Sequence, residues 1–220
     1  MEHLKSAAGQ TPKALCFAAR TDKGVHALEN IATCWFPGPF DVQAFLKEAH
    51  ELETPGLRNI KISPVDPKVH ARGNSRGKRY RYEINGPSAD TSWQIVPKLD
   101  SDAIRQALKY IEGEHDFQSF RVSGCSAATT VKKIFEVKLV EKAFPPLEKG
   151  GQGGFHIEIY GNAFLRQMIR ILVGTLCEIG AGFRRPEDIR AILEARDRKA
   201  AGISAPAHGL TLVTVYFQAF

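Results

Sequence analysis

The chain has 220 residues, of which 43% are hydrophobic, so it has enough apolar side chains for a packed core and too many for a disordered protein. The 30 lysines and arginines exceed the 24 acidic residues, and the net charge of +6 is compatible with a polyanionic partner such as nucleic acid. The 4 cysteines and 7 histidines do not cluster at metal-ligand spacing, which argues against a zinc site and favours reduced thiols.

The chain shows no sign of a membrane or secretory segment. Its first residues are polar, unlike a signal peptide. Its most apolar stretch, residues 163–180, is short and carries two arginines, so it is not expected to span a bilayer. We therefore expect an intracellular protein, and the sequence leaves cytoplasm, nucleus and organelle open.

Two apolar runs, residues 14–18 and 31–36, predict buried strands that flank a polar loop. The loop reads Ala-Arg-Thr-Asp-Lys-Gly-Val-His-Ala from residue 19 to residue 27, and Gly24 allows a sharp turn or a positive φ. Asp22 lies between two cations that favour its charged form, so it could act as a nucleophile or a base. The same spacing also fits a solvated turn with a surface ion pair.

The next elements are a helix over residues 41–52, a strand over residues 58–65 and, after a turn, an alternating strand over residues 78–84. In the last of these, Tyr80 and Tyr82 share one face and arginines alternate on the other. A buried core aromatic is the alternative interpretation of Tyr80.

The rest of the chain again mixes helices and strands. In chain order we expect a helix over residues 100–112, strands over 131–140 and 155–160 joined by a mobile loop at 145–154, a helix over 163–179, a helix from 186 to 196, and a strand over 210–217. Few strands are joined by the helical crossovers that a parallel sheet needs. The pattern predicts an α+β fold with helices on one side of a largely antiparallel sheet.

The stretch from Gly161 to Arg170 carries two arginines in an apolar context. Arg166 and Arg170 are four residues apart, so a helix would place them on one face. An arginine in an apolar helix is costly to bury unless it is paired, and this cost predicts a carboxylate partner for Arg170. The alternative is an arginine near a helix end that reaches solvent.

The loop around Asp22, the strand around Tyr80, the stretch 161–170 and the segment 200–210 together resemble the TruA-like tRNA pseudouridine synthases. The resemblance covers about residues 14–217 and implies that Asp22 is the nucleophile, Tyr80 the active-site tyrosine and Arg170 the partner of Asp22. Tyr82 is the fallback for Tyr80.

The same resemblance implies two ferredoxin-like halves with a central active-site cleft, residues 1–70 with the catalytic Asp loop and residues 71–220. The first half is expected to be incomplete, because a strand and a helix that precede the catalytic strand in the family have no counterpart here. A homodimer or a partner chain is expected to cover the sheet edge left open.

The implied function is an RNA pseudouridine synthase that isomerises uridine in structured RNA without a cofactor or a metal. The expected substrate is tRNA, and rRNA is the alternative. The alternative is a catalytically idle RNA-binding or ribonucleoprotein assembly factor on the same fold, which Ala19 and Ile171 favour because the family usually has Gly and Asn there. The residues expected to contact RNA are basic or polar: Arg20, Lys23, His26, Arg72, Arg76, Lys78, Arg79, Arg81 and Arg166.

Overall fold

The computed structural model divides the chain into two compact units. The described residues are 9–39, 41–51, 58–95, 98–125, 127–142 and 154–218. The first unit comprises residues 1–19, 31–75 and 217–220, and the second comprises residues 20–30 and 76–216. The loop that carries Asp22 thus belongs to the second unit, although the sequence assigns it to residues 1–70. The division into two ferredoxin-like halves stays a prediction.

The first unit contains an antiparallel pair of strands, β1 (Ala14–Phe17) and β3 (Ala32–Trp35). Both strands are therefore where the sequence predicts them. The prediction that they are buried is wrong, because of their residues only Thr33 is buried and Phe17 is 41% exposed. A two-stranded pair has few neighbours that could cover both of its faces.

The helix of the first unit, α2 (Val42–Glu51), confirms the prediction for residues 41–52. It begins after Asp41, whose carboxylate accepts hydrogen bonds from the backbone N–H groups of Gln43 and Ala44. The strand predicted over residues 58–65 is wrong, since these residues form no ladder. Asn59 adopts a φ of 55°, and Pro64 has no N–H to donate, so neither suits a strand.

The main sheet has six strands, and the pairs with an assigned direction are mostly antiparallel. In sheet order the strands are β2 (His26–Ala27), β8 (Leu210–Phe217), β4 (Ser75–Ile84), β7 (Phe155–Gly161), β6 (Val131–Glu141) and β5 (Gly113–Asp116). The pairs β4–β7, β6–β7 and β5–β6 are antiparallel, and β2 runs parallel to β8. The predicted α+β class with a largely antiparallel sheet is confirmed.

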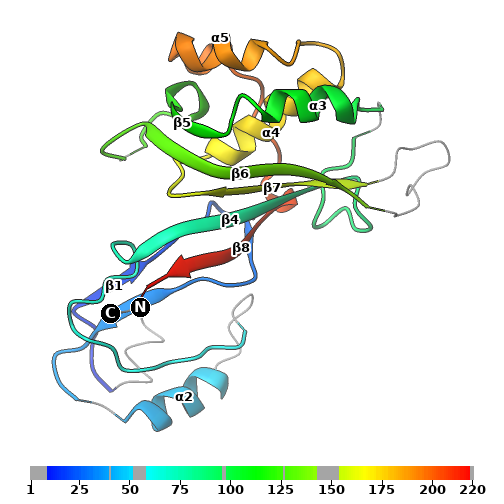
Figure 1. Ribbon diagram of the computed structural model, residues 1–220. Helices are drawn as coiled ribbons and strands as arrows, with labels where there is room; N and C mark the ends of the chain where they lie inside the picture. Colours follow the sequence, from blue (N-terminus) through cyan, green and yellow to red (C-terminus); the bar gives the residue numbers. More distant parts are fainter. Residues whose placement is uncertain are drawn as a thin grey trace. The chain divides into compact units, whose positions relative to one another are not determined.

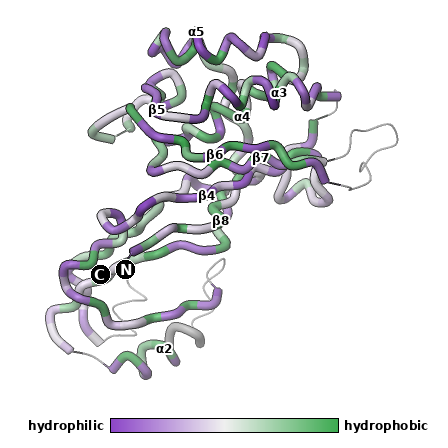
Figure 2. Tube along the Cα trace, viewed as in Figure 1, coloured by the Kyte–Doolittle hydropathy of each residue, from purple (hydrophilic) through white to green (hydrophobic). Residues whose placement is uncertain are grey.

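Strand β4 shows the predicted alternation. Tyr80, Tyr82 and Ile84 are buried on one face, and Arg79 and Arg81 are half-buried on the other. Figure 2 shows hydrophilic and hydrophobic colours following one another along the sheet strands. The tyrosines therefore belong to the covered face of the sheet, and the two arginines to the opposite face.

Three helices of the second unit, α3 (Ser101–Leu108), α4 (Met168–Gly180) and α5 (Asp188–Ala195), lie on one side of the sheet (Figure 1). Asp100 caps α3 through the backbone N–H groups of Asp102 and Ala103. Every residue of α4 except Arg170 and Glu178 is buried, which confirms a helix packed on nearly all sides. These helices supply the layer that covers Tyr80 and Tyr82.

Helix α4 begins later than the sequence predicts. Gln167 has a left-handed backbone with φ 60°, so the helix begins at Met168 rather than at Ala163. Arg166 therefore precedes the helix, and the prediction that Arg166 and Arg170 share a helix face is wrong. The loop predicted at 145–154 lies almost entirely outside the described residues. None of the described helices is long and apolar enough to cross a membrane.

Candidate active site

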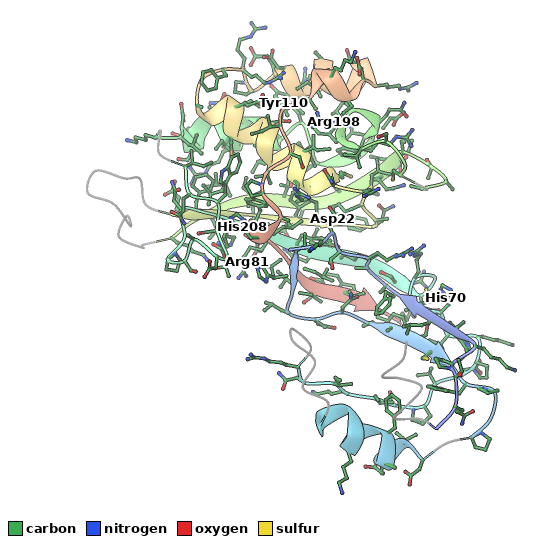
Figure 3. All side chains as sticks on the ribbon, turned by 180° about the vertical axis from the view of Figure 1, so that it is seen from behind. Asp22, His70, Arg81, Tyr110, Arg198 and His208 are labelled. Carbon is green, nitrogen blue, oxygen red and sulfur yellow. The ribbon has the colours of Figure 1, made fainter. Side chains whose placement is uncertain are left out.

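The loop that carries Asp22 is a turn anchored to the last strand of the sheet. The backbone N–H of Val25 donates to the carbonyl oxygen of Asp22 at 3.1 Å, and Gly24 has a φ of 85°, as its position predicts. Strand β2 then pairs with β8, and the N–H of Leu28 donates to the carbonyl oxygen of Leu212 at 2.8 Å. These bonds fix the position of Asp22, which is labelled in Figure 3.

The Asp22 carboxylate faces the guanidinium of Arg170. Arg170 Nη1 lies 3.3 Å from Asp22 Oδ2, while Arg170 Nε donates to the carbonyl oxygen of Ala205 at 2.7 Å. The side chains of Arg170 and Asp22 are 15% and 25% exposed, so the pair is partly shielded but open to a ligand. The predicted pairing of the two residues is confirmed. One anchored guanidinium thus orients the Asp22 carboxylate.

Tyr80 lies in the same neighbourhood. Its ring is 8% exposed and meets the Phe164 ring edge-on, with ring centres 5.3 Å apart and an angle of 83°. Burial raises the pKa of Tyr80, and the charge of Asp22 raises it further, so the hydroxyl stays protonated. Tyr80 therefore carries a neutral hydroxyl within the electrostatic range of the Asp22 carboxylate.

The segment 201–209, named here the closing segment, packs between β4 and α4. The Tyr82 hydroxyl donates to the carbonyl oxygen of Pro206 at 2.8 Å, and the N–H of Ala205 donates to the carbonyl oxygen of Arg170 at 3.0 Å. Burial raises the pKa of Tyr82, and a negative charge on Cys177 would raise it further. The positive charge of Arg170 lowers the pKa of Tyr82. The closing segment is the part that anchors Arg170 through its backbone.

Two glycines allow the closing segment to approach its neighbours closely. A Cβ at Gly209 would lie 2.7 Å from the Tyr82 ring, and a Cβ at Gly174 of α4 would overlap the carbonyl oxygen of Ile203. The N–H of Gly202 donates to Thr175 Oγ1 at 2.9 Å. Larger side chains at these glycines would displace the segment from the helix and the strand.

Three of the predicted RNA-binding residues lie on the loop that carries Asp22. Arg20, Lys23 and His26 are exposed on its own loop. Arg79 pairs with Glu136 at 2.8 Å and Arg81 with Glu158 at 2.9 Å, on the face of β4 opposite Tyr80. The other four are spread over the chain: Arg72 and Arg76 are exposed, Lys78 is buried, and Arg166 is exposed just before α4.

Sequence reasoning missed three parts of this site. They are the carbonyl of Ala205 that holds Arg170, the Phe164 ring against Tyr80, and the β2–β8 pairing that anchors the Asp22 loop. A backbone carbonyl leaves no signal in the sequence, and a two-residue strand is too short for a period. The described residues contain no group of three or more His, Cys, Asp or Glu side chains that could hold a metal.

Comparison with known proteins identifies the family. A family model described as tRNA pseudouridine synthase matches residues 107–218. The tRNA pseudouridine synthase A of Syntrophotalea carbinolica is 38% identical over 214 residues, which cover 94% of this chain and 81% of that protein. The corresponding proteins of Acetivibrio thermocellus and Bacillus pumilus are 39% and 35% identical, each over 91% of this chain, and 81% and 80% of their own lengths are covered. The protein therefore belongs to the tRNA pseudouridine synthase family.

Proposed function

We propose that this chain isomerises uridine to pseudouridine in tRNA, with Asp22 as the nucleophile. The observation that carries the proposal is the partly exposed Asp22 carboxylate 3.3 Å from an anchored Arg170, with the Tyr80 ring beside it. Several relatives are named tRNA pseudouridine synthase A. A catalytically idle RNA-binding protein is not favoured, because such a protein would have no need to keep this partly buried charge pair.

The reaction exchanges one bond of the nucleotide for another. The bond between C1′ and N1 breaks, a bond between C1′ and C5 forms, N1 gains a proton, and the hydrogen on C5 leaves. Asp22 attacks either C1′ of the sugar or C6 of the base, and its carboxylate is released again when the new bond has formed. The balance needs no oxidant, reductant or cofactor.

Arg170 and Tyr80 have separate roles in this proposal. Arg170 orients the Asp22 carboxylate, because its guanidinium is itself fixed by the Ala205 carbonyl. Tyr80 supplies a ring against which the uracil stacks while it turns, and its protonated hydroxyl can donate to the base. Neither the glycosidic bond nor C5 is reachable in a stacked helix, so the target nucleotide must leave its stack.

The basic residues that the sequence predicts to contact RNA fall into two groups. The exposed Arg20, Lys23 and His26 lie on the Asp22 loop and suit contacts with the phosphates next to the target uridine. Arg79 and Arg81 are engaged by carboxylates on the opposite face of β4, so we assign them no contact with the target nucleotide. A homodimer or a partner chain stays a prediction that light scattering of the purified protein would test.

The test uses tRNA transcribed with tritium at C5 of uridine. Pseudouridine formation releases that hydrogen to water, so tritium release reports the reaction directly. The native chain should release it, and Asp22→Ala should release none above background while binding tRNA with nearly the native affinity. Release by Asp22→Ala at the native rate would refute the role of Asp22, and no release by the native chain on any tRNA would refute the function.

A further inference from the structure

A second group of basic residues lines an open cavity of about 310 Å³. The cavity is formed by the turn after the 3-10 helix at 118–120 and by the segment that follows α5. Its lining includes polar Gln118 and Ser123 as well as arginines. We name the arginines in and next to it the basic strip, and its members are Arg121, Arg166, Arg196 and Arg198.

Cys125 lies close to two members of the basic strip, Arg166 and Arg121. The backbone N–H of Arg166 donates to Cys125 Sγ at 3.5 Å, and a Cβ at Gly124 would lie 4.0 Å from Arg166 Nη1. Burial works to raise the pKa of the Cys125 thiol, but hydrogen bonds from two backbone N–H groups and the charges of Arg121 and Lys132 outweigh it. The pKa therefore lies below its ordinary value, as expected where the local potential is positive.

The carboxylates near the cavity do not cancel this charge. Asp116 pairs with Arg196 at 3.1 Å and also accepts the backbone N–H of Gln118 at 3.1 Å. Asp197 Oδ1 accepts the backbone N–H of Lys199 at 3.0 Å. Arg121 and Arg198 have no carboxylate partner among the described residues, so the cavity keeps a net positive lining.

The basic strip is continuous with the proposed active site along the chain. Arg166 precedes Arg170 by four residues, and between them Gln167 Oε1 accepts a hydrogen bond from Ser204 Oγ of the closing segment at 3.1 Å. A strand of RNA whose uridine reaches Asp22 could therefore continue over Arg166 toward Arg121. Guanidinium groups around an open polar cavity match phosphodiester oxygens, which carry charge but no sequence information.

We propose that the basic strip binds backbone phosphates of the tRNA on one side of the target uridine. The inference rests on the proposed function for the identity of the RNA. Arg166 belongs to the 161–170 motif and is already expected to contact RNA, and the other members of the strip extend that contact to a surface outside the motifs around Asp22, Tyr80 and Arg170. An acidic protein segment is the competing occupant, and it would leave tRNA binding independent of the strip.

The first experiment measures the tRNA affinity of Arg121→Gln over a range of salt concentrations. We expect binding about three- to tenfold weaker at 0.1 M salt, and a log–log salt slope smaller in magnitude by about 1, because one phosphate contact is lost. Arg121→Lys should recover most of the affinity. An affinity and a salt slope equal to those of the native chain would overturn the proposal.

The matched control is Lys109→Gln. It removes one positive charge from an exposed position at the end of α3, beside a different cavity where Arg105 and Lys138 lie among acidic residues. We expect it to bind tRNA like the native chain. An equal loss in Lys109→Gln and Arg121→Gln would mean that net charge alone matters, and it would overturn the proposal.

A second measurement needs no substitution. Iodoacetamide should alkylate Cys125 of the native chain, and saturating tRNA should slow that reaction at least about threefold, because a bound backbone covers the strip. Unchanged alkylation of Cys125 would overturn the proposal. Both measurements read binding, so they decide the inference even if the native chain releases no tritium from tRNA, and the tritium assay decides the function even if the strip proves irrelevant.

Discussion

A single charged residue in an apolar stretch, Arg170, was one of the clues to the site. Burying the Arg170 guanidinium without a partner would be costly, and this cost predicts a carboxylate partner. The resemblance to the family implies Asp22, which lies 148 residues away in the chain. The structure confirms Asp22 as that carboxylate at 3.3 Å. It also adds the Ala205 carbonyl as a second acceptor, which makes Arg170 a fixed support rather than a mobile counterion.

Arg170→Lys tests whether the shape of the guanidinium matters. A lysine keeps the charge, but its single ammonium cannot hold the fork geometry toward both Ala205 and Asp22. We expect the single-turnover rate of pseudouridine formation to fall about 10- to 100-fold, because the carboxylate loses its orientation. The control is Arg185→Lys, at a side chain that is 76% exposed and that should react like the native chain. A native rate in Arg170→Lys would show that charge alone suffices.

The face of Arg79 and Arg81 could be predicted from the sequence, but their partners could not. Strand alternation places both arginines opposite Tyr80, where Glu136 and Glu158 pair with them. These partners lie on β6 and β7, and no local sequence pattern predicts ion pairs between strands so distant in the chain. The sequence therefore did not predict that carboxylates engage these two arginines.

At the scale of elements, periodic segments were predicted well and their boundaries less well. The alternation in β4 and the apolar faces of α2 and α3 were sufficient to place these elements. The strand predicted at 58–65 fails because of Asn59 and Pro64, and α4 starts late because Gln167 adopts a left-handed backbone. The positive φ values of Asn59 and Gln167 depend on tertiary contacts, and the hydrophobic period does not encode them. The effect of Pro64 follows from the sequence itself.

Gly174→Ala tests how α4 packs against the closing segment. Helix propensity alone predicts that this change stabilises the protein by about 1 kcal/mol. The overlap of the new Cβ with the Ile203 carbonyl predicts the opposite sign, a loss of about 1–3 kcal/mol in the free energy of unfolding. Denaturant unfolding decides between them. Gly38→Ala, where the nearest atom would be 3.9 Å away, should change stability by less than about 0.5 kcal/mol.

At the scale of the whole molecule, the α+β class and the largely antiparallel sheet were predictable from composition and period. The make-up of the two contact units was not, because residues 20–30 join the second unit through pairing with β8. That pairing is parallel and only two residues long. It nevertheless decides which unit carries Asp22, and with it the whole proposed catalytic group of Asp22, Tyr80 and Arg170.

Alkaline stability is a property of the whole molecule that the buried tyrosines should control. Burial raises the pKa values of Tyr80 and Tyr82 above the ordinary value of about 10, so the folded protein keeps protons that the unfolded chain loses. The free energy of unfolding should be independent of these groups below pH 10. Above it, stability should fall by about 1.4 kcal/mol per pH unit for each group, until the folded protein itself loses the proton.

Denaturant unfolding of Tyr82→Phe between pH 8 and pH 11 measures this effect. The variant loses the hydrogen bond to Pro206, so it should be less stable by about 1 kcal/mol at pH 8. Its stability should then fall less steeply above pH 10 than that of the native chain, because one titrating group is gone. Parallel curves for the two proteins would contradict the assignment.

The most direct measurement is the single-turnover rate of tritium release from C5-labelled tRNA by Asp22→Asn at saturating protein concentration. Asparagine has nearly the shape of aspartate but no negative charge, so folding and tRNA affinity should be close to native, and the rate should fall at least about 10³-fold, as for loss of a nucleophile. A rate within tenfold of the native one, on tRNA bound with native affinity, would contradict the claim that the Asp22 carboxylate carries the reaction.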